Sequence, residues 1–95
     1  MTNYEVMFII DAALEDEKKE AAIETVKETI GADGEVTNAD VWGMRKLAYP
    51  IRKKNEGYYV VLEFKGSQSL PKELDRRLKI SDHIVRHMIV NRDEK

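Results

Sequence analysis

The chain has 95 residues and no cysteine, which predicts one domain over residues 1–95 and excludes disulfides, thiolate metal sites and a cysteine nucleophile. No secretory signal and no apolar run of membrane-spanning length are visible, so we expect a cytoplasmic protein. The formal net charge is −2, but the charges are unevenly distributed: residues 11–40 carry ten acids and three bases, whereas residues 41–95 carry thirteen bases and seven acids. This distribution is compatible with binding of nucleic acid at a defined site rather than with generic polyanion binding.

The first two predicted elements are a strand and a helix. Residues 4–10 are nearly all apolar and rich in β-branched and aromatic side chains, which predicts a strand at the centre of a sheet. Residues 14–30 carry apolar side chains at helical spacing with charges between them, which predicts an amphipathic helix. Gly31 and Gly34 are expected to end this helix, because glycine tolerates the left-handed conformation of many helix ends.

A long extended stretch and a second central strand follow. Residues 35–53 are predicted to be extended, with a bulge or bend at Gly43. Pro50 cannot donate a hydrogen bond to a neighbouring strand, so this strand is expected at a sheet edge. Residues 54–57 are predicted to form a turn, and the nearly continuous apolar run 58–64 a strand inside the sheet.

The last part of the chain predicts one more helix and one more strand. The helix begins at Ser69 or Leu70, buries leucines spaced four apart, and ends at Ser81. Residues 84–90 form the fourth strand, and residues 91–95 a short polar tail. The order β-α-β-β-α-β predicts an α+β, ferredoxin-like fold of split β-α-β units, in which both helices cover one face of a four-stranded antiparallel sheet.

Catalytic and metal-binding arrangements do not stand out in the sequence. His83 and His87 are four residues apart, but they fall at the start of a predicted strand and inside it, and no further ligand types complete a site. Helix capping explains Ser69 and Ser81 better than nucleophilic catalysis does. We therefore expect a protein that is not an enzyme and that has no metal or cofactor.

Basic and aromatic side chains gather in the second and third strands. Such a cluster commonly holds RNA phosphates and stacks on bases, but basic residues on an edge strand also prevent unwanted strand pairing, and both interpretations stay open. Trp42, the only tryptophan, is expected either to cover the core or to anchor a partner. The cluster comprises Arg45, Lys46, Arg52, Lys53 and Lys54, with Tyr49, Tyr58 and Tyr59 beside them.

Three segments together resemble one known family. They are residues 4–9, residues 42–51 with 56–59, and residues 84–90; the most specific reads Gly-x-Arg-basic-Leu-Ala-Tyr-x-Ile from residue 43. With these segments in this order, the chain resembles the bacterial small-subunit ribosomal protein S6 family over essentially its whole length. The resemblance implies a non-enzymatic protein of the small ribosomal subunit with a ferredoxin-like fold.

The resemblance also implies partners. Members of this family bind the central domain of the small-subunit ribosomal RNA together with ribosomal protein S18, as a heterodimer, so we expect these two partners and a monomer when the protein is free. The surface for the protein partner is expected at Trp42, Arg45, Lys46, Leu47 and Tyr49. Contacts to RNA are expected at Asn3, Tyr4, Arg52, Lys53, Lys54, Arg86, His87 and Arg92. Thr2 and Asn3 stand where many members are basic, which would weaken an RNA contact there.

Two alternatives belong to other classes of protein. The same fold serves homodimeric modules that regulate by binding a small molecule, and small dimeric enzymes. The polar turn 66–69 offers no obvious ligand loop, and no pocket with a histidine or paired carboxylates is visible in the sequence. Both alternatives predict self-association, whereas a ribosomal protein that pairs with a different chain allows a free monomer.

Overall fold

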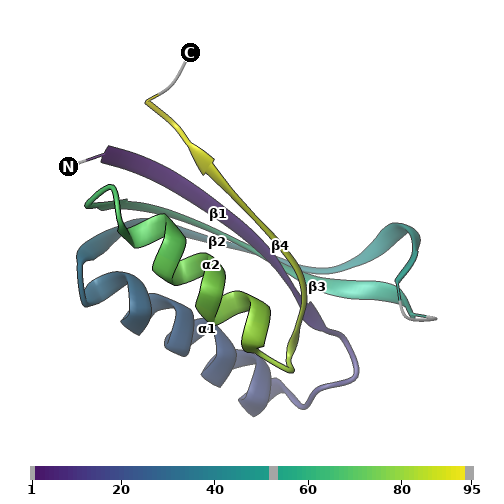
Figure 1. Cartoon of the computed structure of the whole chain (residues 1–95). Coiled ribbons are helices and arrows are strands. Elements are labelled where there is room, and N and C mark those ends of the chain that lie inside the picture. The colour runs from purple at the N-terminus through teal and green to yellow at the C-terminus, as the bar shows by residue number, and fades with distance from the viewer. Residues whose placement is uncertain (1, 52–53, 94–95) are drawn as a thin grey trace.

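Two helices cover one face of a four-stranded antiparallel sheet in the computed structural model, which describes residues 2–51 and 54–93, with side chains for residues 2–46 and 56–93 (Figure 1). The strands lie in the order β2-β3-β1-β4. The arrangement confirms the predicted β-α-β-β-α-β, ferredoxin-like fold. Its elements are β1 (Thr2–Asp11), α1 (Asp16–Gly31), β2 (Gly34–Ile51), β3 (Lys54–Gly66), α2 (Leu70–Ile80) and β4 (Ile84–Asn91).

The core lies between the helices and the covered face of the sheet. Strand alternation directs every second side chain of β1 and β3 to that face, and the register sets Val6 opposite Leu62 and Phe8 opposite Val60. Helix α1 contributes apolar residues three and four apart, and α2 contributes the predicted leucines. The core includes Tyr4, Val6, Phe8, Ile10, Ile23, Val26, Ile30, Val60, Leu62, Phe64, Leu70, Leu74, Leu78 and Ile84.

The positions of the strands in the sheet follow their composition. The two nearly continuous apolar strands, β1 and β3, are the inner pair, and β2 is an edge strand, as predicted. The predicted irregularity at Gly43 is confirmed, because the register with β3 shifts between Val41 and Gly43 and the φ angle of Gly43 is 80°. Glycine adopts this left-handed conformation without steric cost, so it permits the bulge.

The predicted turn at residues 54–57 is wrong. These residues begin β3, and Lys54 already pairs with Ile51 of β2. The connection between the two strands is therefore shorter than the polar composition of residues 54–57 suggested, and its residues 52–53 lie outside the described part of the chain. Pairing with β2 extends the strand through polar residues that favour a turn in isolation.

The predicted end of α1 is correct in position and wrong in mechanism. Gly31 is the last helical residue, and Ala32 follows it with right-handed helical angles, so neither Gly31 nor Gly34 supplies a left-handed stop. The backbone N–H groups of Ala32 and Asp33 donate to carbonyls of the last helical turn instead. Gly34 has a different role, because a side chain there would clash with the carbonyl oxygen of Lys65 on β3.

The predicted side-chain cap of α2 at Ser69 is also wrong. Ser69 has helical angles and makes no capping hydrogen bond with its side chain; its Oγ lies 3.0 Å from Oγ of Ser67. Pro71 in the first turn, where its missing N–H leaves no partner unsatisfied, helps to start this helix. At the other end, the backbone N–H of Ser81 donates to the carbonyl of Leu78.

Replacing Leu74 by alanine should destabilise the fold far more than replacing Ile80, which belongs to the same helix. Leu74 is fully buried in the core, whereas Ile80 is 67% exposed. We expect Leu74→Ala to lower the free energy of unfolding by about 2–5 kcal/mol, and Ile80→Ala by roughly 0.5 kcal/mol or less. Urea unfolding followed by circular dichroism measures both; equal losses would contradict the described position of α2.

Candidate interaction surfaces

The sheet face opposite the helices carries apolar side chains that no element of the described chain covers. On β4 these are Met88 and Val90, which are 53% and 42% exposed. Met88 lies opposite Met7 of β1, and Met7 lies opposite Val61 of β3, so the three side chains form an apolar strip across three strands. We call the surface formed by Met7, Val61, Met88 and Val90 the open face. An exposed apolar strip of this kind is typical of a surface that a partner covers.

Trp42 extends the apolar surface onto the edge strand β2. Its ring stacks on Tyr59 of β3, with centroids 6.3 Å apart and planes inclined by 4°. Its Nε1 donates a hydrogen bond to Oδ2 of Asp40 at 2.9 Å. The side chain is nevertheless 46% exposed. Of the two expectations for Trp42, this position favours a ring that is held in place on one side and offers the other to a partner.

Arg45 and Lys46 lie beyond Trp42 on β2, and both side chains are exposed. Together with Trp42 and Tyr59 they line a shallow hollow at the sheet edge. The predicted partner contacts whose side chains are described therefore gather at one place. The side chains of the other candidates in this segment lie outside the described residues: Leu47, Tyr49, Arg52, Lys53 and Lys54.

A polar cluster closes the opposite end of the sheet, where β1 begins and β4 ends (Figure 1). Asp93 accepts hydrogen bonds from the backbone nitrogen of Asn3 at 2.9 Å and from its Nδ2 at 3.1 Å. These hydrogen bonds, the backbone one first, lower the pKa of Asp93. Arg92 pairs through Nη1 with the carboxylates of Glu63 and Glu5, the latter at 3.7 Å. The predicted RNA contact Arg92 is thus held by two acidic side chains.

Arg86 lies on the sheet face opposite the helices, apart from the polar cluster at Arg92. It is exposed and lies on β4 opposite Ile9 of β1, two residues before Met88 and therefore on the same side of the strand. Five residues, 87–91, separate Arg86 from Arg92 in the sequence. These two predicted RNA contacts therefore do not form one cluster, because Arg86 lies within β4 and Arg92 just beyond its last residue.

Two predicted RNA contacts face the helices instead of the open face. Tyr4 is 6% exposed and stacks on Phe64, with ring centroids 5.4 Å apart. The side chain of His87 is 13% exposed, and its Nε2 lies 2.6 Å from Oδ1 of Asp75 on α2. These contacts leave both rings little surface for a nucleotide.

The open face contains functional candidates that the sequence did not reveal. Residues 84–90 have apolar side chains at both alternate sets of positions, so periodicity alone does not say which set is buried. The register of β4 with β1 shows which set faces the core: His87 and Ile89 lie opposite core residues of β1, whereas Met88 lies opposite Met7. Only the pairing with β1, a contact between distant parts of the sequence, identifies Met88 and Val90 as surface residues.

The described residues contain neither a metal-binding cluster nor a membrane-spanning helix. No group of three or more histidine, aspartate or glutamate side chains among them is placed to hold a metal ion. His83 lies in the turn before β4 and His87 within that strand. Neither α1 nor α2 is long and apolar enough to cross a membrane.

The chain is similar to known proteins over nearly its whole length. The family described as ribosomal protein S6 matches residues 3–91. The small ribosomal subunit protein bS6 of Clostridioides difficile is 47% identical over 90 residues, which are 95% of this chain and 98% of that protein. The bS6 protein of Alkaliphilus metalliredigens is 49% identical over 94 residues, 99% of this chain and all of that protein. The crystal structure of 30S ribosomal protein S6 from Thermotoga maritima superimposes with a TM-score of 0.91 at 34% identity, covering 96% of this chain and 87% of that one.

A ferredoxin-like domain with an uncovered sheet face and a basic, aromatic edge strand has the features typical of a binding protein. The family match and the two near-full-length relatives then show that the chain belongs to the ribosomal protein S6 family. Members of that family are structural proteins of the small ribosomal subunit, which confirms the predictions of a ribosomal protein that is not an enzyme and that is located in the cytoplasmic ribosome.

Replacing His87 by alanine should raise the pKa of Asp75. That pKa lies below its ordinary value of 3.8, first because of the hydrogen bond with His87 and second because of the one with Lys79. A carbon-detected NMR titration of the Asp75 carboxyl group measures the change. Lys79→Ala is the matched control and should raise the pKa by less; an unchanged pKa in His87→Ala would contradict the contact between β4 and α2.

The same interaction predicts a pH dependence of stability. The pKa of Asp75 is lower in the folded protein than its ordinary value. The ionised Asp75 therefore contributes fully to the free energy of unfolding above the ordinary pKa, and this contribution is lost as the pH falls through the lower pKa of the folded state. The difference in unfolding free energy between the natural protein and Asp75→Asn should therefore be constant near neutrality and shrink in acid. Urea unfolding at several pH values tests this, and a difference that grows in acid would contradict it.

Proposed function

We propose that this protein binds the central domain of the small-subunit ribosomal RNA together with ribosomal protein S18, as a heterodimer. The protein partner docks on the edge strand at Trp42, Arg45 and Lys46 and reaches onto the open face. The observation that supports this most directly is the position of the stacked, half-exposed Trp42, which joins the cationic hollow to the apolar strip. The family assignment favours this function over a homodimeric regulator.

The apolar part of the surface supplies the affinity in this proposal. Met88 and Val90 of β4 are 53% and 42% exposed, and Trp42 of β2 is 46% exposed. Covering such side chains contributes roughly 25 cal/mol for each Å² of apolar surface removed from water. The stacked Trp42 is a suitable anchor, because its ring is already held by Tyr59 and loses little freedom on binding.

The charges on β2 supply selectivity for a partner. Arg45 and Lys46 lie on an edge strand whose backbone groups would otherwise pair with a second copy of the chain, so they suppress self-association in the free protein. In the heterodimer they favour a partner with acidic groups at the matching positions. Leu47 and Tyr49 continue the same strand and belong to the proposed contact.

The RNA contacts in this proposal act through phosphates and shape. Arg86 on the open face, Asn3 and Arg92 at the end of the sheet, and the basic residues 52–54 at the β2–β3 connection supply the positive charge. A phosphate beside Arg92 would replace the carboxylates of Glu5 and Glu63. Tyr4 and His87 act indirectly, because their rings pack β1 and β4 against the rest of the fold.

Removing both edge cations should weaken the heterodimer. We expect the double substitution Arg45→Ala with Lys46→Ala to raise the Kd for S18 by about two- to thirtyfold, since each exposed charge contributes a fraction of a kcal/mol. Isothermal titration calorimetry with purified S18 measures it. The matched control removes Lys27 and Lys72, two cations on the helical side, and should leave the Kd unchanged.

A third variant separates protein binding from RNA binding. Arg86→Ala should leave the heterodimer intact, while the slope of log affinity for RNA against log salt concentration falls by about one. Filter binding of the purified heterodimer to a central-domain RNA fragment measures the slope. An unchanged Kd for S18 in the edge double variant would exclude the proposed docking surface, and an unchanged salt slope in Arg86→Ala would exclude Arg86 as a phosphate contact.

A further inference from the structure

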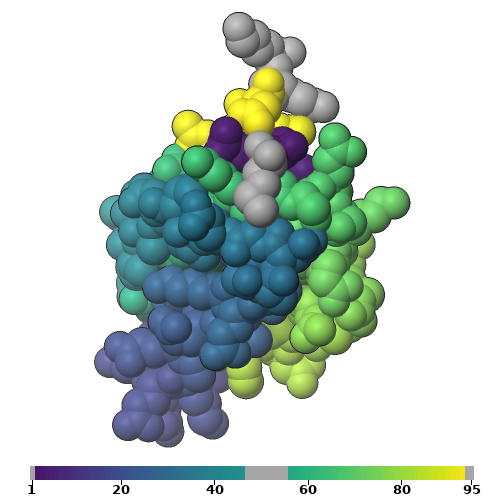
Figure 2. Space-filling view, turned by 90° about the vertical axis from the view of Figure 1, so that its left-hand side faces the viewer, coloured from purple at the N-terminus to yellow at the C-terminus, as the bar shows by residue number. Residues whose placement is uncertain are grey.

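The helical side of the molecule contains a groove that the proposed RNA and S18 contacts do not use. It runs between α1 and α2, which lie side by side on this surface (Figures 1 and 2), and has a volume of about 370 Å³. Its floor is formed by Ala22, Val26, Leu74 and Leu78. The volume falls within the range of about 300–1,000 Å³ that is usual for small-molecule sites.

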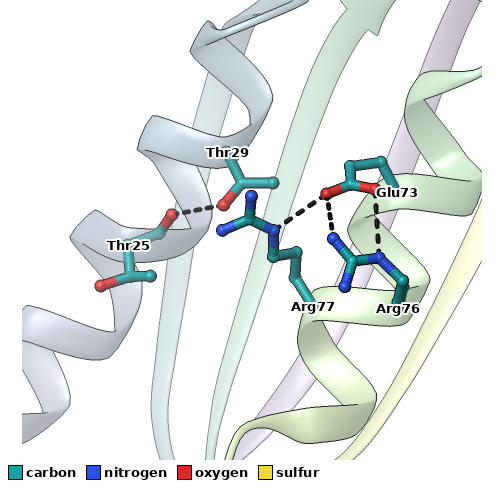
Figure 3. Close-up of polar contacts among 5 residues, drawn as sticks. All are labelled: Thr25, Thr29, Glu73, Arg76 and Arg77. Atoms are coloured by element: carbon teal, nitrogen blue, oxygen red, sulfur yellow. Dashed lines mark hydrogen bonds and ion pairs between the residues drawn. The ribbon is translucent and has the colours of Figure 1, made fainter.

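Short side chains on α1 keep this groove open. Ala21 and Thr25 form one wall, and Thr29 continues it toward the end of the helix, while Arg77 forms part of the facing wall on α2 (Figure 3). The hydroxyl groups of Thr25 and Thr29 donate to backbone carbonyls one turn earlier in α1, each at 2.9 Å. Because these polar groups are already satisfied, the wall accepts an apolar ligand without leaving a buried donor unpaired.

One end of the groove carries positive charge that no carboxylate of its described lining offsets. The helices run antiparallel, so the first turns of α1 meet the last turn of α2 and the turn that follows it. Lys18 and His83 line the groove at this end, together with Ser81. Among the described residues that line the groove, none carries a carboxylate. The side chain of Arg77 turns away from Lys18, because its Nε donates to Glu73 at 2.9 Å, one turn nearer the start of α2 (Figure 3).

We propose that this groove binds a carboxylate with a single apolar chain. The chain lies over Ala22, Val26 and Leu78, and the carboxylate lies beside Lys18 and His83. The match rests on complementarity: an apolar trough with a positively charged end fits a ligand that is apolar along its length and anionic at one end.

The acidic outer side of α1 argues against a larger occupant. Glu17, Glu24 and Glu28 are exposed on this helix beside the groove. An acidic protein segment broad enough to contact both helices would meet these carboxylates, and like charges at an interface oppose binding. A ligand confined to the groove avoids them, which favours a narrow, single-chain anion over an acidic peptide.

Octanoate is a suitable probe. The full-length protein labelled with ¹⁵N is titrated with octanoate below the concentration at which it forms micelles, and in parallel with octanol and octylammonium. We expect saturable shifts at Ala21, Thr25 and Leu78, with octanoate binding about two- to fivefold more tightly than octanol, as expected for an exposed ion pair, and octylammonium binding most weakly.

Three substitutions on α1 test the site. Ala21→Phe adds a ring to the wall of the groove and should abolish saturable binding of octanoate; Ala21 is exposed, so the fold should persist, which a thermal melt checks. Glu20→Phe adds the same ring on the outer side of α1 and should bind as the natural protein does. Lys18→Ala should remove most of the preference for octanoate over octanol.

Three results would overturn the proposal. They are equal affinity for octanoate and octanol in the natural protein, unchanged binding in Ala21→Phe, and shifts that centre on Met7, Val61 and Met88 of the open face instead of the groove. The last result would mean that the probe binds the surface proposed for the protein partner.

Discussion

The packing of α1 and α2 on a single face of the sheet is the constraint on which the other features depend. Both helices bury their apolar stripes against the same side of β1 and β3, where the core residues lie at less than a tenth of their full exposure. A four-stranded sheet has two faces, so this packing leaves the other one uncovered. Any apolar side chain that the alternation places there, such as Met88, must remain exposed or be covered by another molecule.

The charge distribution follows the same division. The acidic residues of α1 lie on the helical side, whereas Arg45 and Lys46 lie on edge strand β2 and Arg86 on the open face. The low net charge of the chain is thus compatible with an RNA-binding protein, because the acids and bases occupy different surfaces. Within a heterodimer, a basic partner can supply further neutralisation of phosphates.

Much of the fold could be predicted because its signals are local. Strand and helix periodicity, the position of Gly43 and the leucine stripe of α2 identify the elements and their order. The errors occur where a contact between distant residues decides the structure. Pairing with β2 turns residues 54–57 into strand, and the close approach of β2 and β3, not a helix stop, explains Gly34.

The candidate site was predictable only in part, for the same reason. Trp42, Arg45 and Lys46 gather as the sequence suggested, because they are neighbours on one strand. The burial of Tyr4 and His87 depends on Phe64 and Asp75, which lie far away in the sequence. The exposure of Met88 depends likewise on the register with β1, which the mixed pattern of residues 84–90 does not specify.

The most direct test of the account is hydroxyl-radical footprinting of this protein, free and within assembled small ribosomal subunits. Trp42 and Met88 are about half exposed in the free chain, and Ile80 on α2 is 67% exposed. We expect oxidation of Trp42 and Met88 to fall sharply on assembly, whereas oxidation of Ile80 should persist. Protection of Ile80 with continued oxidation of Trp42 and Met88 would show that the helical side is the one bound, and would contradict the account.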